Sequence, residues 1–144
     1  MTYSLPQGAR RSRSAQAYAS IGLETKVFSA SPEQLITLLF DGAQAAIAKA
    51  RLYMENGNTE GRGMAISKAI DIVDSGLKAS IDMEAGGELA INLTATYELV
   101  IRNLLLANLN ADLAKLNLAD RLLTEIGDAW RTSVDPSRSE ASSL

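Results

Sequence analysis

The sequence contains no cysteine and no histidine. Without cysteine the chain has no disulfide framework, no thiol nucleophile and no thiolate metal site. Without histidine it lacks the commonest general base and a usual zinc ligand. The same absence excludes a di-iron helical bundle, which needs Glu-x-x-His pairs, and a phosphotransfer bundle that carries its phosphate on histidine.

Proline and aromatic residues are scarce. The only prolines are Pro6, Pro32 and Pro136, so nothing forbids long helices between the last two. Aromatic residues make up 5% of the chain, whereas apolar residues together make up 47%. A chain of 144 residues predicts one domain, or one domain plus tails, that buries a core without covalent staples.

The charge pattern bears on the partners and the location of the protein. The formal net charge is −3 and the pI is near 5.0, which argues against nucleic-acid binding. Positive charge gathers only in Arg10, Arg11 and Arg13, and no apolar run of the kind that a secretory signal needs follows them. We expect a cytoplasmic protein with no stable membrane insertion. Residues 1–14 are expected to form a disordered basic tail and residues 132–144 a second disordered tail.

A capping motif marks the start of the first helix, expected over about residues 32–55. Ser31 can act as the N-cap, Pro32 suits the first position, and Gln34 completes a capping box. Apolar residues then recur at steps of three and four along one face, until the turn residues of segment 56–63 end the helix.

The same periodicity predicts three further helices, over about residues 64–84, 88–107 and 111–131. Gly76 lies inside the second one: either another backbone comes close there, or the helix absorbs a cost of about 1 kcal/mol. The pair Gly86 and Gly87 is expected to form the corner between the second and third helices, and Asn110 the N-cap of the fourth.

Short connections favour antiparallel neighbours, so the sequence predicts an all-α, antiparallel up-down four-helix bundle. The bundle domain is expected over residues 15–131, beginning with a short helical or extended N-terminal segment over residues 15–30. No repeat and no strand pattern competes with this interpretation.

No motif predicts catalysis or metal binding. The carboxylates of Asp82, Glu84 and Glu88 lack the ligand spacing of a calcium loop, and the glycine pair lacks the strand and GK[ST] of a phosphate loop. We therefore expect no enzyme and no cofactor. Surplus apolar residues outside the core stripes either form a groove for an amphipathic partner or merely widen the packed faces: Leu38, Ile72, Ile91, Leu99, Leu106 and Leu118.

Five segments occur in a characteristic order between Ala17 and Arg131: AYASIGLETKV, SASPEQLITLLFDGA, ISKAIDIVDSGLKASIDMEAGGELAINL, TYELVIRNLLLAN and LLTEIGDAW. In this order and spacing they resemble the FliS-type flagellar secretion chaperones, which are cytoplasmic and specific for flagellin. Two places depart from the family pattern. QAAIAKA stands where a bulkier apolar run is more usual, and Thr96 stands where leucine is usual.

The resemblance implies a bundle that binds the disordered C-terminal region of flagellin, prevents its premature polymerisation and aids its delivery to the gate of the flagellar type III export apparatus. It implies no cofactor and no catalysis. We expect a monomer or a weak homodimer. The alternative from the surplus apolar residues alone is a self-associating or regulatory bundle that pairs through the same faces.

The flagellin contacts that we expect come from two helices. They are Leu38, Phe40, Asp41, Gly42 and Ala45 in the first, and Asn92, Ala95, Leu99, Arg102, Asn103 and Leu106 in the third. Asn92 and Asn103 either bond to an extended client backbone or face water, and Asp41 and Arg102 are interpreted as rim charges. Tyr18 and Ile21 are assigned by the resemblance to an N-terminal gating segment that packs over the groove. Trp130 matches the family's terminal tryptophan and is interpreted as a core residue.

Overall fold

The computed structural model describes residues 30–134. The predictions for the basic tail, for Tyr18 and Ile21 of the gating segment, and for the chain after residue 134 lie outside the described residues.

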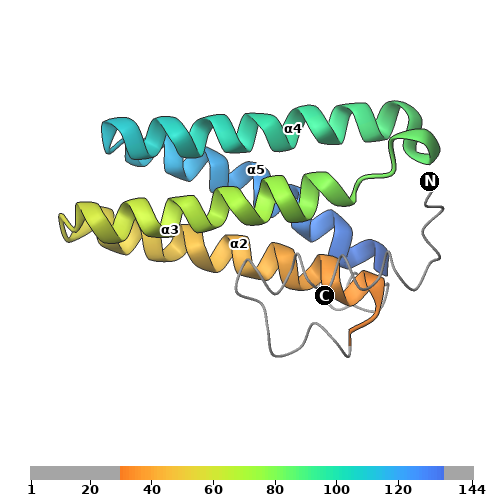
Figure 1. Cartoon of the computed structure of the whole chain (residues 1–144), viewed down its shortest axis with the longest axis horizontal. Coiled ribbons are helices and arrows are strands. Elements are labelled where there is room, and N and C mark those ends of the chain that lie inside the picture. The colour runs from red at the N-terminus through yellow and green to blue at the C-terminus, as the bar shows by residue number, and fades with distance from the viewer. Residues whose placement is uncertain (1–29, 135–144) are drawn as a thin grey trace, which may run out of the picture.

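The described chain is a bundle of four antiparallel helical rods, as Figure 1 shows. The elements are α2 (Pro32–Glu55), α3 (Thr59–Asp71) with its continuations η2 (Ile72–Leu77, a π-helix) and η3 (Lys78–Ser80, a 3₁₀-helix), α4 (Met83–Asn110) and α5 (Leu113–Val134). No strand occurs between residues 30 and 134. The predicted all-α bundle is confirmed.

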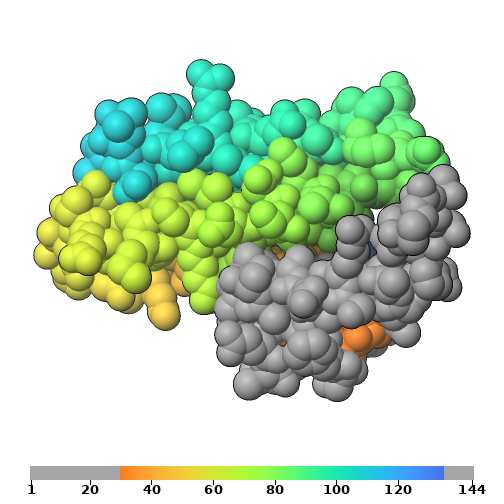
Figure 2. Space-filling view, in the orientation of Figure 1, coloured from red at the N-terminus to blue at the C-terminus, as the bar shows by residue number. Residues whose placement is uncertain are grey.

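The four rods are arranged in a square. Helix α2 packs against α3 and α5, and α4 packs against α5 and, more lightly, against α3. Helices α2 and α4 therefore stand on one diagonal, at opposite edges of the molecule in Figure 1. Figure 2 shows α3 and α4 side by side along the length of the bundle. A hydrogen bond joins α3 to α4, from Arg62 Nη2 to the carbonyl of Asn108 at 3.0 Å. An ion pair joins η3 to α4, between Lys78 and Glu98 at 3.8 Å.

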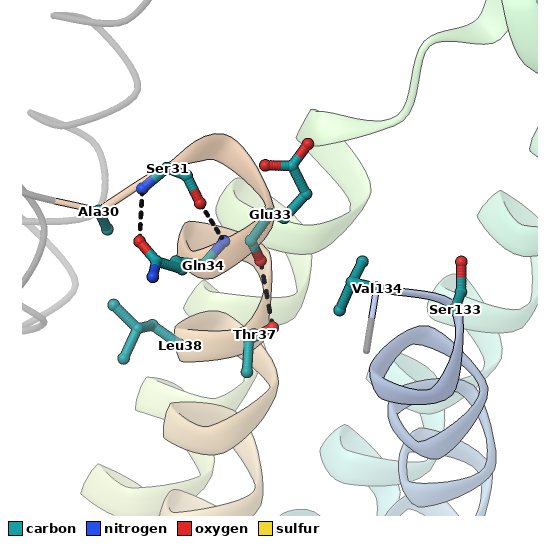
Figure 3. A pocket seen from close by; sticks show the side chains of 8 residues that line it. All are labelled: Ala30, Ser31, Glu33, Gln34, Thr37, Leu38, Ser133 and Val134. Atoms are coloured by element: carbon teal, nitrogen blue, oxygen red, sulfur yellow. Dashed lines mark hydrogen bonds between the residues drawn. The ribbon is translucent and has the colours of Figure 1, made fainter. Parts of the chain in front are cut away.

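The start of α2 matches the predicted capping box. The backbone N–H of Gln34 donates to Ser31 Oγ at 3.2 Å, and the backbone N–H of Ser31 donates to Gln34 Oε1 at 2.8 Å. Figure 3 shows both bonds beside a hollow between the start of α2 and the end of α5, where Ser133 and Val134 lie. Two of the otherwise unpaired groups at this helix end are thereby satisfied.

Helix α3 begins at Thr59, earlier than the predicted residue 64. Asn58 caps it, because its side-chain oxygen accepts from the N–H of Gly61 at 2.9 Å. A Cβ added at Gly61 would lie 2.8 Å from the Tyr53 ring, so the glycine allows α2 and α3 to meet closely. The turn residues of this segment thus occupy the first turn of a helix as well as the corner.

The glycine pair does not form the corner that we expected. The chain turns at Ile81, and Asp82 caps α4 by accepting from the N–H groups of Glu84 and Ala85 at 3.1 and 3.0 Å. Gly87 instead bends α4 after its first turn, with φ 53° and ψ −131°. The carboxylate cap fixes the helix start, and the positive φ is used for a bend inside the helix.

The last corner also differs from the prediction. Asn110 is the final residue of α4, and Ala111 ends that helix in a left-handed conformation with φ 48°. Asp112 acts as the cap, because its Oδ1 accepts from the N–H of Lys115 at 3.2 Å. Helix α5 continues to Val134, so residues 132–134 of the expected disordered tail are helical.

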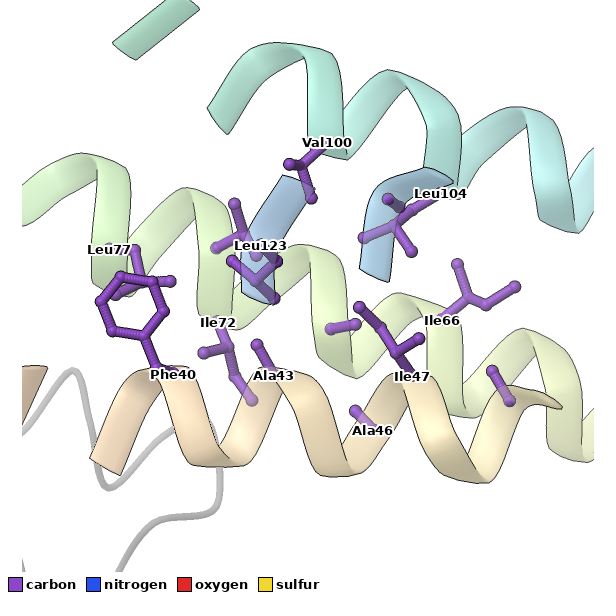
Figure 4. Packing of buried hydrophobic residues seen from close by; sticks show 14 of the residues in the cluster. Phe40, Ala43, Ala46, Ile47, Ile66, Ile72, Leu77, Val100, Leu104 and Leu123 are labelled. Carbon is purple, nitrogen blue, oxygen red and sulfur yellow. The ribbon is translucent and has the colours of Figure 1, made fainter. Parts of the chain in front are cut away.

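The core is built by side chains from all four rods, as Figure 4 shows. The largest fully buried ones are Phe40, Leu39, Ile47, Ile66, Ile72, Leu104, Leu116, Leu123, Val73 and Val100. Each such side chain stabilises the fold by roughly 1.5–3 kcal/mol relative to its exposed state. Buried alanines such as Ala43, Ala46 and Ala50 keep α2 close to its neighbours.

Among the described residues one helix, Met83–Asn110, is long and apolar enough to cross a membrane by length and composition alone. This is weak evidence for a span, because a helix that packs on a protein core passes the same test. One face of α4 packs in this way, through Tyr97, Val100 and Leu104.

Candidate partner-binding groove

An apolar groove of about 400 Å³ opens at the end of the bundle where α2 and α4 begin and α5 ends. We call it the end groove. Each rod contributes to its lining: Ile36 and Phe40 from α2, Leu77, Ser80, Ile81 and Asp82 around η3, Ala85, Gly86, Leu89, Ala90, Leu93 and Tyr97 from α4, and Ile126 and Trp130 from α5. Among these described residues Asp82 is the single charged one, and its carboxylate is engaged in capping α4.

The bend at Gly87 shapes the α4 side of the end groove. Ala85 and Gly86, which precede the bend, line the groove together with Leu89 and Leu93, which follow it. Leu89 is 72% exposed although it is apolar. The first turn of α4 is therefore set at an angle to the rest of the helix, and it adds apolar surface to the rim.

The α5 side of the end groove is fastened to α2 by polar bonds. The indole N–H of Trp130 donates to Thr37 Oγ1 at 3.0 Å. In the next residue, the guanidinium of Arg131 donates to Asp41 Oδ1 at 2.6 Å and to Gln44 Oε1 at 2.8 Å. Trp130 therefore combines packing against the core with a place in the groove lining.

Tyr97 supplies a buried phenol to the groove lining. Its side chain is 3% exposed. Burial raises the pKa of the Tyr97 phenol above its usual value, because the ionised form loses its hydration. The phenol therefore stays protonated and neutral at any pH near neutrality, in keeping with the apolar lining.

Lys78 lies outside the groove lining, on the side of η3 that faces α4. Its ammonium contacts Asp74 at 3.1 Å and Glu98 at 3.8 Å. The hydrogen bond to Asp74 is the main cause that raises the pKa of Lys78. The charges on this part of the bundle thus pair with one another.

The contacts predicted in α2 point mostly away from the core. Asp41 and Ala45 are exposed, and Leu38 and Gly42 are half-buried. Phe40 is the exception, since it is 1% exposed and belongs to the core, with one edge in the end groove. With 3.6 residues per turn, Phe40 is directed inward, away from the face that carries Asp41 and Ala45.

The contacts predicted in α4 form a row on its outer face. Asn92, Ala95, Leu99, Arg102 and Leu106 follow one another at steps of three and four, and Leu99 is 46% exposed. Because α2 and α4 are diagonal, this row and the outer face of α2 do not meet in one groove.

Asn103 is buried, at 4% exposure, and its amide donates to the carbonyl of Leu99 in its own helix at 2.9 Å. Neither alternative for Asn103 describes this arrangement, since the side chain faces neither water nor an exposed groove.

The surplus apolar residues have different fates. Ile72 is fully buried, Leu38, Leu106 and Leu118 are half-buried, and Ile91 and Leu99 are exposed. Three exposed leucines that the sequence analysis did not single out lie near the corner between α4 and α5: Leu105, Leu109 and Leu113.

Most residues of the end groove were missed as site residues. The signal lay beside the caps: Ile81 precedes the cap Asp82, and Ile36 lies in the first turns of α2. Apolar side chains at helix ends have fewer neighbours to cover them than those at the middle of a bundle. Ile126 and Trp130 near the end of α5 follow the same rule.

Comparison with known proteins gives a consistent result. A family model described as Flagellar protein FliS matches residues 14–137. The Flagellar secretion chaperone FliS of Salmonella typhimurium is 49% identical over 116 residues, which make up 81% of this chain and 86% of that protein. The protein of the same name from Escherichia coli is 45% identical over 119 residues, 83% of this chain and 88% of that protein. The Flagellar secretion chaperone FliSB of Pseudomonas aeruginosa is 39% identical over 113 residues, 78% of this chain and 89% of that protein.

Proposed function

The chain belongs to the Flagellar protein FliS family, and on that premise we propose that it is a cytoplasmic export chaperone whose client is the disordered C-terminal region of flagellin. In this role it prevents premature polymerisation and aids delivery to the gate of the flagellar export apparatus. It performs no catalysis and uses no cofactor.

The end groove is the observation that carries the proposal. Its volume of about 400 Å³ and its apolar lining suit the side chains of a short amphipathic segment. Burying apolar area stabilises such a complex by about 25 cal/mol per Å². Ordering a disordered client subtracts several kcal/mol from that gain, so the complex is specific and still releasable.

The outer faces of α2 and α4 supply further contacts in this proposal. Leu38 and Ala45 on α2, and Ala95 and Leu99 on α4, offer small and apolar side chains next to polar ones. A client that touches both faces has to pass around the bundle, because the two helices are diagonal. The proposed client is therefore held along an extended path rather than in one pocket.

Isothermal titration calorimetry with a peptide from the C-terminal region of flagellin tests the proposal. We expect stoichiometric binding with a negative heat-capacity change, the mark of apolar burial. Leu89→Glu should weaken binding strongly, since Leu89 is 72% exposed and lines the end groove. Leu109→Glu is the matched control: it is 78% exposed, in the same helix, and outside the groove lining. A dedicated chaperone should bind its client at protein concentrations of tens of micromolar. Absence of binding heat at these concentrations would reject the proposal.

Self-association is a second candidate, favoured by the exposed Leu105, Leu109 and Leu113 around the corner between α4 and α5. Sedimentation velocity separates the two. A stable dimer that Leu109→Glu dissolves, and that flagellin peptide leaves unchanged, supports self-association.

A further inference from the structure

Arg131 is one of two buried polar residues in the described part of the chain, at 9% exposure in the last turns of α5. A buried guanidinium is costly unless its N–H groups are bonded. Here Nη2 donates to Asp41 Oδ1 and Gln44 Oε1 of α2, and Nη1 donates to Asp128 Oδ1 at 3.4 Å. The side chain thus joins the end of α5 to the middle of α2.

The hydrogen bonds of Arg131 lie directly behind the groove lining. Trp130 and Phe40 line the end groove, and the next residue of each, Arg131 and Asp41, forms the ion pair. In each pair of neighbours the apolar member faces the groove and the polar member bonds across the two helices. Thr37 adds a second bond, through the indole of Trp130.

Gly127 allows the Arg131 side chain to pack closely between α5 and α2. A Cβ added at Gly127 would lie 3.1 Å from both Arg131 Nη1 and Phe40 Cδ1. The guanidinium and the Phe40 ring therefore both lie against the backbone of α5 at this glycine. A change in the position of Arg131 has a short path to Phe40 as well as to Trp130.

We propose that Arg131 is a positioning residue for the end groove: its bonds to Asp41 and Gln44 hold Trp130 and Ile126 against α2 and so fix the width of the groove. This inference rests on the proposed function. Without Arg131 the last turns of α5 lose the ion pair and the hydrogen bond to α2 and keep the Trp130–Thr37 bond, and a helix end with fewer partners frays more readily. The large buried side chains of α5, Leu116 and Leu123, lie in earlier turns and stay packed.

Trp130 is the single tryptophan of the chain, so its fluorescence reports on the groove wall directly. The test compares Arg131→Leu, which keeps much of the buried volume and removes the bonds, with Arg131→Lys, which keeps the charge and can reach Asp41. Arg121→Leu is the control, an exposed arginine in the same helix. Circular dichroism and the midpoint of thermal unfolding establish that each full-length variant is folded.

For Arg131→Leu we expect Trp130 emission at longer wavelength, stronger quenching by acrylamide, and affinity for a tryptophan-free flagellin C-terminal peptide lowered about tenfold, because the groove is no longer preorganised. Arg131→Lys should recover most of both properties, and Arg121→Leu should match the wild type. If Arg131→Leu does not fold, Asp41→Ala removes the main acceptor from the exposed side of α2. Trp130 quenching in the free protein is then the deciding readout, because Asp41 is itself an expected client contact.

Quenching and affinity equal to those of Arg121→Leu would overturn the inference. Increased quenching with unchanged peptide affinity would also overturn it, because Arg131 would then hold Trp130 without shaping a client site. If the wild-type protein binds no peptide, the proposed function fails. The quenching of the free protein then still decides whether Arg131 positions Trp130.

Discussion

The backbone of Gly76 lies directly against the side chain of Leu39, at the place where η2 crosses α2. A Cβ added at Gly76 would be 2.8 Å from Leu39 Cδ2 and 3.2 Å from Cδ1. Leu39 is fully buried and has little room to move. The glycine therefore accommodates a close neighbour, but that neighbour is the Leu39 side chain and not another backbone, as one of the two interpretations had it.

Gly76→Ala is therefore expected to destabilise the fold by about 1–3 kcal/mol through overpacking, even though alanine is the better helix former. Urea unfolding measures the change. Ser75→Ala, at an exposed neighbouring position of the same π-helix, should change stability by less than about 0.5 kcal/mol. A stabilised Gly76→Ala protein would contradict the close contact.

Gly87→Ala should lower stability by about 1–3 kcal/mol, because alanine rarely adopts its positive φ. Gly57→Ala is a matched control: Gly57 also has a positive φ, no atom lies within 4 Å of its added Cβ, and it lies outside the end groove. Both variants should lose stability in urea unfolding. Only Gly87→Ala should also lower the affinity for the flagellin peptide, measured by calorimetry, since the bend shapes the groove rim. Equal peptide affinities of Gly87→Ala and Gly57→Ala would show that the bend at Gly87 does not contribute to binding.

Asp82→Ala should destabilise the protein by about 1 kcal/mol, since it removes the cap of α4. Asp82→Ser should retain most of the stability, because serine is also a good N-cap. Hydrogen exchange of the amides of Glu84 and Ala85 gives the local readout, with faster exchange in Asp82→Ala alone. Uniformly faster exchange across all helices would point to a global effect instead.

Tyr97 predicts a dependence of stability on alkaline pH. Its pKa is raised in the folded protein, so its contribution is complete below the unfolded value of about 10 and is lost as the pH rises above it, by up to about 1.4 kcal/mol per pH unit. Tyr97→Phe removes this loss. Unfolding free energies at about pH 8 and about pH 11 should therefore fall less for Tyr97→Phe than for the wild type. Parallel losses in the two proteins would mean that burial of the phenol does not matter.

The sequence predicted the start of α2 well and the path of the chain through η2 poorly. The capping box of Ser31 and Gln34 is a local pattern, and local bonds form it. The π-helix η2, which is wound less tightly than an α-helix, had a weaker signal in the sequence. Apolar residues recur there at steps of four, at Ala65, Ala69, Val73, Leu77 and Ile81, and the first four are buried. A stripe with a period of four stays on one face only if the helix is wound less tightly than 3.6 residues per turn, as a π-helix is.

The site was harder to predict than the fold. Periodicity shows which face of a helix is apolar, but it does not show which neighbour covers that face. The outer row of α4 was found, whereas its separation from α2 follows from the order of the rods around the square. The burial of Phe40 and Asn103 has a related reason, since residues at the edge of a stripe turn inward or outward according to the neighbouring helix.

The diagonal placement of α2 and α4 has a kinetic consequence for a client that engages both. Once one stretch is seated, the other is tethered nearby at a high effective concentration, and modest local affinities combine into firm retention. Removal proceeds in reverse, by detaching one stretch at a time, so that no single step has to break the whole contact. A chaperone with this arrangement dissociates slowly from its client on its own, and it releases the client stepwise to a partner that binds the client at one end.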